Sequence, residues 1–189
     1  YLKKMRDLGL KFKPDPKKGF VCYCDANFSG YWNKAFTAVD PSTAKSWSGW
    51  IIFYAGCPVS WASKLQSQVA LSTTEAEYIA MSQSLRDVIP VMNLLQEMRE
   101  RKYQVICTEP HVYCKVFEDN SGALELARLP KLRPRTKHIN VCYHHFREHV
   151  WKGLIKIFPV DTKNQIADTL TKALAQNNFT CHRKFICGK

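Results

Sequence analysis

Four acidic residues that are far apart in the sequence lie where predicted secondary-structure elements begin or end. Asp25 ends an apolar run, and Glu77 lies in the opening turns of a long helical pattern. Asp119 follows a second apolar run, and Asp168 lies early in the last helical pattern. In α/β proteins, strand ends and helix starts collect at one edge of the sheet, where ligands bind. We therefore expect the four carboxylates to meet at such an edge.

Carboxylates that meet in this way repel one another and need cations between them. Oxygen-only ligands suit Mg²⁺ or Mn²⁺. Two such ions about 3.5–4 Å apart can activate a water molecule and stabilise the leaving oxygen in phosphodiester hydrolysis. Each acid, taken alone, also has a simpler explanation. Asp25 could start a turn and Asp119 could cap the next helix. Asp168 could pair with Lys172 on the same helix face.

Two neighbouring glutamates compete for the helix position in this site. Ser72–Glu75 has the pattern of a capping box, in which Glu75 folds back onto the helix start. Glu77 instead heads a row of apolar residues that faces the predicted sheet: Met81, Leu85, Val88 and Met92. A charged residue in an apolar row is costly unless something pairs with it. Glu77 is therefore the predicted ligand.

The apolar patterns predict an α/β fold, a five-stranded mixed sheet flanked by helices. The expected order is β-β-β-α-β-α-α-β-α. Strands are expected over 19–25, 46–54, 57–63, 112–117 and 154–160, and helices over 72–100, 121–128, 138–152 and 163–175. Ala55-Gly56 should form a hairpin between the second and third strands, and Pro90 should kink or divide the first helix.

The overall charge favours a polyanionic partner. The 189 residues carry a net charge of +12, and a surface this basic suits nucleic acid or an anionic membrane. No apolar run approaches the roughly 20 residues that span a bilayer, and no basic helix has a clean apolar face. We therefore expect nucleic acid rather than a membrane as the partner, with a basic, proline-broken loop over 129–137 as its contact.

The ends of the chain differ in composition from its centre. Residues 1–18 read as a basic lead-in, 19–176 as the folded domain and 177–189 as a basic tail. The eight cysteines form no regular framework, and Cys22, Cys24 and Cys114 lie in apolar runs. Reduced thiols and an intracellular location are expected.

Seven short motifs, in order, resemble the ribonuclease H domain of copia-type LTR retrotransposon Pol polyproteins over about residues 19–175. The matching segments are Cys24–Gly30, Ser60–Lys64, Ser72–Ala80, Glu118–Leu124, Arg135–Ile139, Tyr143–Glu148 and Ala167–Lys172. The lead-in resembles the end of the reverse transcriptase connection that precedes this domain. No single motif is specific, but their order and spacing together are.

The resemblance implies a metal-dependent endonuclease that hydrolyses the RNA strand of RNA/DNA hybrids during reverse transcription. The family's acidic quartet falls on Asp25, Glu77, Asp119 and Asp168, which would hold two Mg²⁺ ions, with Mn²⁺ as a substitute. The implied partner is the reverse transcriptase domain of the same polyprotein, with no small-molecule substrate. The implied location is a cytoplasmic virus-like particle with possible nuclear passage.

Two positions depart from the family pattern. Asn27 stands where relatives often have a second aspartate. The loop Val160–Asn164, before the last predicted helix, lacks the histidine that cellular ribonucleases H carry there. Proton transfer or product release would lack its usual helper, and turnover is expected to be slow.

Further residues are candidates for contacts with the hybrid. Phosphate contacts are expected from basic residues, and contacts to 2′-hydroxyls or the backbone from uncharged polar ones. The first set is Lys64, Lys131, Arg133, Arg135, Lys137 and His138; the second is Asn27, Gln83, Asn120 and Ser121. Trp50 and Trp61 are expected in the core.

Three alternatives stay open at the sequence level. Cys142, His145 and His149 have a spacing that could bind zinc, although no fourth ligand is evident. The chain could be a catalytically decayed retroelement remnant that only binds nucleic acid. It could also be another nuclease of similar fold, such as an integrase, but the zinc-binding HHCC module of integrases is absent.

Overall fold

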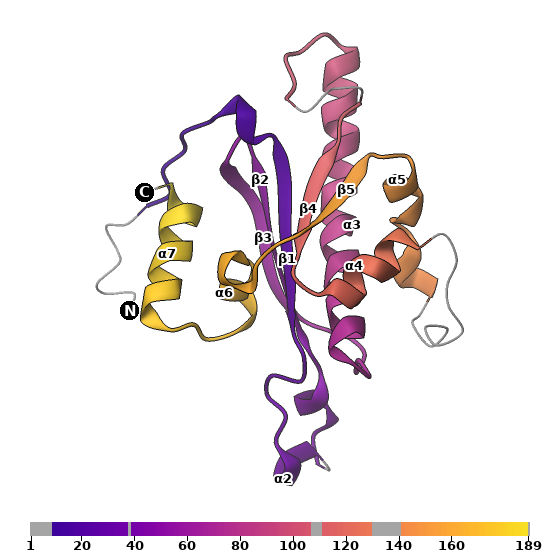
Figure 1. The fold of residues 1–189 in the computed structure, drawn as a ribbon, viewed down its shortest axis with the longest axis vertical. Coiled ribbons are helices and arrows are strands. Elements are labelled where there is room, and N and C mark those ends of the chain that lie inside the picture. The colour runs from indigo at the N-terminus through magenta and orange to yellow at the C-terminus, as the bar shows by residue number, and fades with distance from the viewer. Residues whose placement is uncertain (1–8, 38, 107–110, 130–140, 189) are drawn as a thin grey trace.

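A five-stranded mixed sheet forms the centre of the molecule (Figure 1). The computed structural model describes residues 9–37, 39–106, 111–129 and 141–188. The strands are β1 (Phe20–Asn27), β2 (Trp47–Tyr54), β3 (Cys57–Leu65), β4 (Cys114–Glu118) and β5 (Ile155–Pro159). Their order in the sheet is β3-β2-β1-β4-β5. β1, β2 and β3 pair antiparallel, whereas β4 pairs parallel with both β1 and β5.

The local sequence explains the β2–β3 hairpin and the two faces of β1. Ala55 and Gly56 both have positive φ angles, of 53° and 76°, as a tight two-residue hairpin turn requires. Along β1, Phe20, Cys22 and Cys24 are fully buried in the main core, and the residues between them face the other side of the sheet.

Helices cover both faces of the sheet. The long helix α3 (Thr73–Glu100), with α4 (Ser121–Arg128) and α5 (Arg147–Trp151), lies on one face, and the short α6 (Asp168–Thr171) and α7 (Gln176–Cys187) lie on the other (Figure 1). Shorter elements are α2 (Lys34–Thr37), η1 (Pro16–Lys18), η2 (Pro41–Ala44), η4 (Val141–His144) and η5 (Thr162–Asn164). The predicted mixed sheet flanked by helices is confirmed.

Several details of the helices differ from the prediction. Pro90 does not divide α3, because it lies on the exposed side, where water can satisfy the carbonyl group that loses its partner. The helix expected over 138–152 is reduced, within the described residues, to η4 and α5. The helix expected over 163–175 is reduced to α6, preceded by η5. The segment expected as a tail contains α7, whose Ile186 packs beside Ile51, Phe53 and Ile166.

The two tryptophans expected in the core have different environments. Trp50 is buried, and its indole N–H donates a 2.9 Å hydrogen bond to Asp87 Oδ2. Trp61 is 54% exposed, so its predicted burial is wrong. Trp61 lies on β3, the last strand at one edge of the sheet, where alternate residues stay largely open to solvent.

Candidate metal centre

Asp25 lies near the end of β1 on the face that α6 covers. Its side chain is 1% exposed, and its Oδ2 accepts a hydrogen bond from the Thr171 hydroxyl group of α6. Asp25 pairs across the sheet with Gly49 of β2. A Cβ at Gly49 would lie 2.6 Å from Thr171 Cγ2 and 2.8 Å from Leu170 Cβ. The glycine therefore allows α6 to approach the sheet closely enough for Thr171 to reach Asp25.

Glu77 reaches the end of β1 from the second turn of α3. The helix start is fixed by Ser72, whose hydroxyl accepts the Glu75 N–H at 3.1 Å, while Glu75 Oε2 accepts the Leu71 N–H at 2.8 Å. Glu75 therefore folds back onto the helix start as expected, although it bonds Leu71, one residue before the cap, and not Ser72 itself. Glu77 is buried, and its Oε2 accepts the backbone N–H of Ala26 at 2.7 Å. The carboxylate is thereby held against the residue that follows Asp25.

Asp119 lies between β4 and α4 and is only half-buried. The helix after it is capped by Asn120, whose Oδ1 accepts the Ala123 N–H at 3.0 Å. The simpler explanation for Asp119, that it caps this helix, is therefore wrong. Its carboxylate is free to face the acids of β1 and α3.

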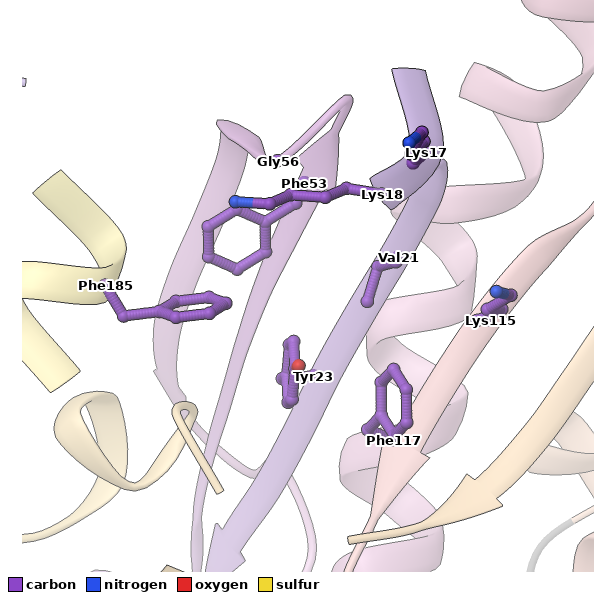
Figure 2. A pocket seen from close by; sticks show the side chains of 9 residues that line it. All are labelled: Lys17, Lys18, Val21, Tyr23, Phe53, Gly56, Lys115, Phe117 and Phe185. Atoms are coloured by element: carbon purple, nitrogen blue, oxygen red, sulfur yellow. The ribbon is translucent and has the colours of Figure 1, made fainter. Parts of the chain in front are cut away.

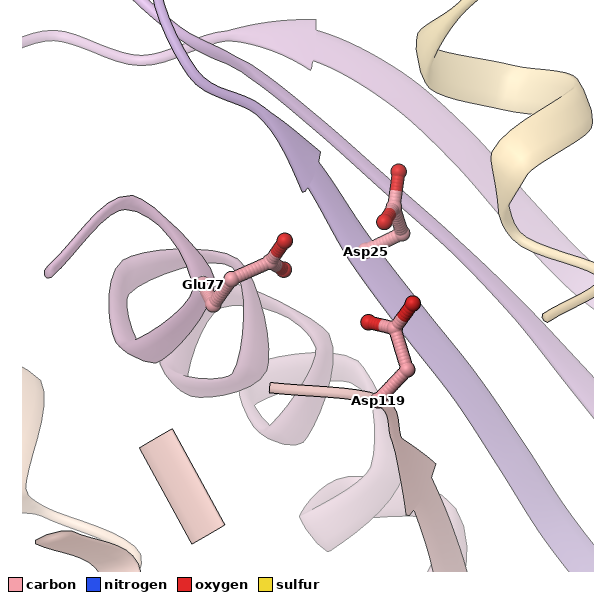
Figure 3. A group of neighbouring side chains, drawn as sticks. All are labelled: Asp25, Glu77 and Asp119. Carbon is pink, nitrogen blue, oxygen red and sulfur yellow. The ribbon is translucent and has the colours of Figure 1, made fainter. Parts of the chain in front are cut away.

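The three carboxylates converge at the edge of the sheet (Figure 3). Asp25, Glu77 and Asp119 each offer an oxygen, and these oxygens lie within 4.8 Å of one another. β1 and β4 are adjacent parallel strands, so their carboxyl ends meet at this edge. Among the described residues, no other group of three or more acidic, histidine or cysteine side chains lies close enough together to hold a metal ion. His145 and His149, which were considered as zinc ligands, are not part of this group.

Asp168 borders this group but is not a member of it. It is the first residue of α6 and is buried. Lys172 links it to the trio: Lys172 Nζ lies 2.9 Å from Asp168 Oδ1 and 3.9 Å from Asp25 Oδ1. The ion pair between Asp168 and Lys172, the simpler explanation for Asp168, is thus present, and it lies beside the acidic group.

Burial and mutual repulsion shift the titration of these acids. Burial raises the pKa of Asp25 to about 7, although the Thr171 hydroxyl opposes the shift. Burial, with the charges of Glu118 and Asp25, raises the pKa of Glu77 to about 11. Burial also raises the pKa of Asp168. For Lys172, burial acts to lower the pKa, but the bond to Asp168 and the charge of Asp25 outweigh it and raise the pKa.

The donor set fits a hard divalent cation. It consists of carboxylate oxygens alone, which suits Mg²⁺ or Mn²⁺ better than softer metals. Two of the three carboxyl groups are held by hydrogen bonds, from Thr171 and from the Ala26 N–H. Acids whose pKa is raised by burial and by one another gain most when a cation replaces their protons.

Comparisons with known proteins show what this chain is similar to in sequence and in fold. No family model matches the chain. It is 36% identical, over 87% of its length, to the retrovirus-related Pol polyprotein from transposon TNT 1-94 of Nicotiana tabacum, of which it spans 12%. A ribonuclease H1 isolated from compost matches 81% of this chain and 92% of its own with a TM-score of 0.53 at 15% identity. The N-terminal RNase H domain of a Mycobacterium tuberculosis protein matches 88% and 96% with a TM-score of 0.51 at 12% identity.

Over most of its own length the chain is similar to retrovirus-related Pol polyproteins from plant transposons, and it has the ribonuclease H fold. The match to the polyprotein covers most of this chain, and the solved structures match it over nearly their whole length. The predicted resemblance and fold class are therefore confirmed.

Within this ribonuclease H fold, the residues predicted to contact substrate are distributed over several elements. Asn27 donates from Nδ2 to the Thr171 carbonyl at 3.2 Å, next to the acids. Asn120 Oδ1 accepts from Thr74 Oγ1 at 3.4 Å as well as capping α4, and Ser121 is exposed at the start of that helix. Lys64 lies on β3 with Nζ 5.1 Å from the centre of the Trp50 ring.

The remaining predicted contacts are farther from the acids or outside the described residues. Gln83 lies six residues beyond Glu77, about 9 Å along α3. Its Oε1 is buried with no hydrogen-bond partner among the residues that the structure describes. The predicted basic contacts between 130 and 140 lie outside the described residues: Lys131, Arg133, Arg135, Lys137 and His138.

The sequence reasoning missed three residues that shape the site. Glu118 is fully buried, accepts the Asn120 N–H at 3.0 Å, and adds its charge to that of Glu77. Gln165 is also fully buried and donates from Nε2 to the Cys24 carbonyl at 2.8 Å, which ties the start of α6 to β1. Thr171 bonds Asp25 directly. Only Glu118 had a visible signal, since it is the last residue of a strand just before Asp119.

Proposed function

We propose that this chain is a metal-dependent ribonuclease that hydrolyses the RNA strand of RNA/DNA hybrids. The observation that carries the proposal is the convergence of Asp25, Glu77 and Asp119 at the edge of a ribonuclease H sheet. The similarity to retrovirus-related Pol polyproteins and the fold shared with solved ribonuclease H structures support the same function. The whole polyprotein's activities are not assigned to this chain.

Two Mg²⁺ ions would be held by Asp25, Glu77, Asp119 and Asp168. In phosphodiester hydrolysis the bound metal supplies an activated water and stabilises the leaving oxygen. The acids hold and position, and do not shuttle protons. Thr171 orients Asp25, the Ala26 N–H orients Glu77, and the Lys172 ammonium reduces the repulsion between Asp168 and Asp25.

Recognition of the hybrid would come from basic and polar residues around this edge. Asn27 and Asn120 flank the acids from β1 and from the start of α4, where they could bond 2′-hydroxyl groups. Lys64 and the basic loop of residues 129–137 would contact phosphates. The partner within a polyprotein would be its reverse transcriptase domain. None of the helices described here is both long and apolar enough to cross a membrane.

Two alternative functions, a decayed binding remnant and an integrase-type nuclease, make expectations that differ from those of the proposed ribonuclease. A decayed remnant would bind nucleic acid without cleaving it, but decay does not favour three acids that keep a common geometry. An integrase-type nuclease would share part of the fold but would act on duplex DNA. The three functions differ in which nucleic acid is cleaved, or in whether any is, and one cleavage assay therefore separates them.

The test is cleavage of matched RNA/DNA hybrid, duplex DNA and duplex RNA by the purified chain in Mg²⁺ or Mn²⁺. We expect cleavage of the RNA strand in the hybrid alone, leaving 5′-phosphate and 3′-hydroxyl ends. Asp119→Asn should reduce cleavage by more than about 100-fold, because loss of a ligand should exceed the 10–100-fold cost of losing a residue that only supports one. Hybrid binding measured in EDTA should survive this substitution.

Asp161→Asn is the matched control, since Asp161 is an exposed aspartate whose side chain makes no cap hydrogen bond. It should leave cleavage unchanged. Equal cleavage by Asp119→Asn and the wild type would refute the ligand role of Asp119. Hybrid binding by the wild type with no cleavage in either metal would instead support the decayed remnant.

A further inference from the structure

A row of aromatic side chains crosses the face of the sheet that α6 and α7 cover only in part. Tyr23, Phe117 and Phe158 are directly opposite one another on β1, β4 and β5. The rings of Tyr23 and Phe117 are stacked, with centres 4.9 Å apart and planes at 20°. Phe117 and Phe158 follow at 5.9 Å and 35°. Phe158 is exposed, so the row is open to solvent at the β5 end.

Lysine side chains lie next to this row. Lys115 of β4 and Lys156 of β5 are opposite one another, one pleat away from Phe117 and Phe158. Lys17 and Lys18 approach from η1, and both are exposed. The face therefore alternates flat apolar rings with ammonium groups.

The aromatic row ends in a cavity of about 330 Å³ between the sheet and α7 (Figure 2). Its walls are the rings of Tyr23, Phe53 and Phe185, which meet edge to face at 5.5–6.4 Å between centres. Lys17, Lys18 and Lys115 line it, and none of its lining residues is acidic. Phe185 is 48% exposed despite these ring contacts. The volume is at the low end of the roughly 300–1,000 Å³ typical of ligand sites.

We propose that this cavity binds an unpaired base of single-stranded nucleic acid, with the adjoining phosphates at Lys17, Lys18 and Lys115. Flat aromatic walls suit a planar base, because bases stack on aromatic side chains whatever their sequence. Three lysines without a lining acid suit a polyanion. An acidic peptide could also pair with the three lysines. The aromatic row that leads into the cavity favours a nucleic acid instead, because every nucleotide carries a planar base.

This site is separate from the metal centre and does not rest on the proposed nuclease activity. Tyr23 and Asp25 lie on the same face of β1, two residues and about 7 Å apart along the strand. α6 lies over Asp25, whereas the cavity is on the other side of Tyr23, towards η1. Binding of a single strand here needs neither a divalent ion nor the four acids.

The test is fluorescence anisotropy of labelled 12-nucleotide dT and U strands with the full chain in EDTA. Lys17→Ala combined with Lys18→Ala should reduce the slope of log affinity against log salt by about 1.4, since each phosphate contact contributes roughly 0.7 for single strands. Arg101→Ala with Lys152→Ala is the matched control. Both residues are exposed cations in i,i+4 ion pairs, neither lines the cavity, and their removal changes the net charge equally.

A second pair of variants tests the aromatic wall. Phe185→Ala should weaken binding about tenfold, the loss expected for one stacking partner. Tyr103→Ala, which removes an exposed aromatic residue at the end of α3, should change nothing. Photocrosslinking of a 5-iododeoxyuridine strand to the unmodified chain gives a result that does not depend on variants. The crosslinked peptides should contain Tyr23, Phe53 or Phe185.

The outcomes are decisive in both directions. Crosslinks confined to the metal centre, or equal effects of the Lys17/Lys18 and the Arg101/Lys152 double variants on the salt slope, would overturn the proposal. Capture of an acidic, tyrosine-containing peptide with no binding of either oligonucleotide would also overturn it and identify a peptide site instead. Asp119→Asn should bind the single strands normally, so failure of the nuclease proposal leaves this result unaffected.

Discussion

The substitution Asp25→Asn should stabilise the metal-free chain at neutral pH. Burial raises the pKa of Asp25 from 3.8 to about 7. A carboxyl group whose pKa is higher in the folded chain gives stability that is fully present below the unfolded pKa. That stability is lost as the pH rises through the folded pKa. Between pH 4 and 7 the unfolded chain ionises this carboxyl group while the folded chain keeps it protonated, so the free energy of unfolding falls with pH.

The shift sets the size of this effect. About three pKa units at 1.36 kcal/mol each give on the order of 4 kcal/mol at pH 7. The pKa of about 7 already includes the opposing effects of Thr171 and Lys172. Asparagine removes the charge and keeps an oxygen that can accept from Thr171, but it adds a buried amide NH₂ group, and leaving such a donor unsatisfied costs about 1–3 kcal/mol. We expect a net gain of about 2 kcal/mol, which for a chain of this size corresponds to about 4–8 °C in Tm.

Thermal unfolding in EDTA at pH 4.5 and pH 7.5 measures this directly. The Tm of Asp25→Asn minus that of the wild type should be several degrees more positive at pH 7.5 than at pH 4.5, because most of the loss in the wild type occurs between these two values. Added Mg²⁺ should raise the Tm of the wild type, because a ligand that binds only the folded chain stabilises it. It should have little effect on the variant. A Tm difference that is the same at both pH values would refute the reasoning.

Asp40→Asn supplies a control of opposite sign. The hydroxyl and backbone N–H of Ser42 lower the pKa of the exposed Asp40. Its stabilising effect is present above the unfolded pKa and is lost as the pH falls through the folded pKa. Replacing it should therefore lower the Tm slightly at pH 7.5, the reverse of the effect at Asp25.

Three further predictions concern the neighbourhood of the acids. Gly49→Ala places a methyl group 2.6 Å from Thr171 Cγ2 and should reduce hybrid cleavage by about tenfold or more through displacement of α6; Gly9→Ala, which meets open space, should not. Lys172→Met should lower the metal-free Tm at pH 7.5 and enlarge the Tm rise caused by Mg²⁺, because Asp168 loses its own cation. Replacing Lys131, Arg133 and Arg135 together with alanine should weaken hybrid binding and flatten its salt dependence. A filter-binding titration measures the salt slope, and an unchanged slope would show that the loop does not contact the substrate.

The sequence predicts the part of the site that regular elements position. The alternation of β1 places Asp25 at a strand end, and the capping box at Ser72 fixes where α3 begins, hence the turn on which Glu77 lies. Both signals are local and strong. The separation of Glu75 from Glu77 followed from the apolar row alone, and the structure buries that row against the sheet.

The part built from short or long-range contacts could not be predicted. α6 has four residues, too few for a periodic signal to set its limits. Its position depends on the absent side chain of Gly49 and on Gln165, which reaches the Cys24 carbonyl 141 positions earlier in the chain. Propensity carries no information about such contacts, which is also why no helix was predicted over the residues of α7.

The acids on β1 and α3 and the acid on α6 differ in how rigidly the fold positions them and in which cations they already contact. Both differences affect metal affinity. Asp25 and Glu77 are fixed on elements that pack in the main core, so their carboxyl groups stay close together whatever occupies the site. Asp168 lies on a short helix and already has a cation in Lys172. A divalent ion that uses Asp168 must share it with that ammonium group, whereas an ion held by Asp25, Glu77 and Asp119 competes mainly with protons. Affinity at the trio should therefore rise with pH more steeply than affinity at Asp168.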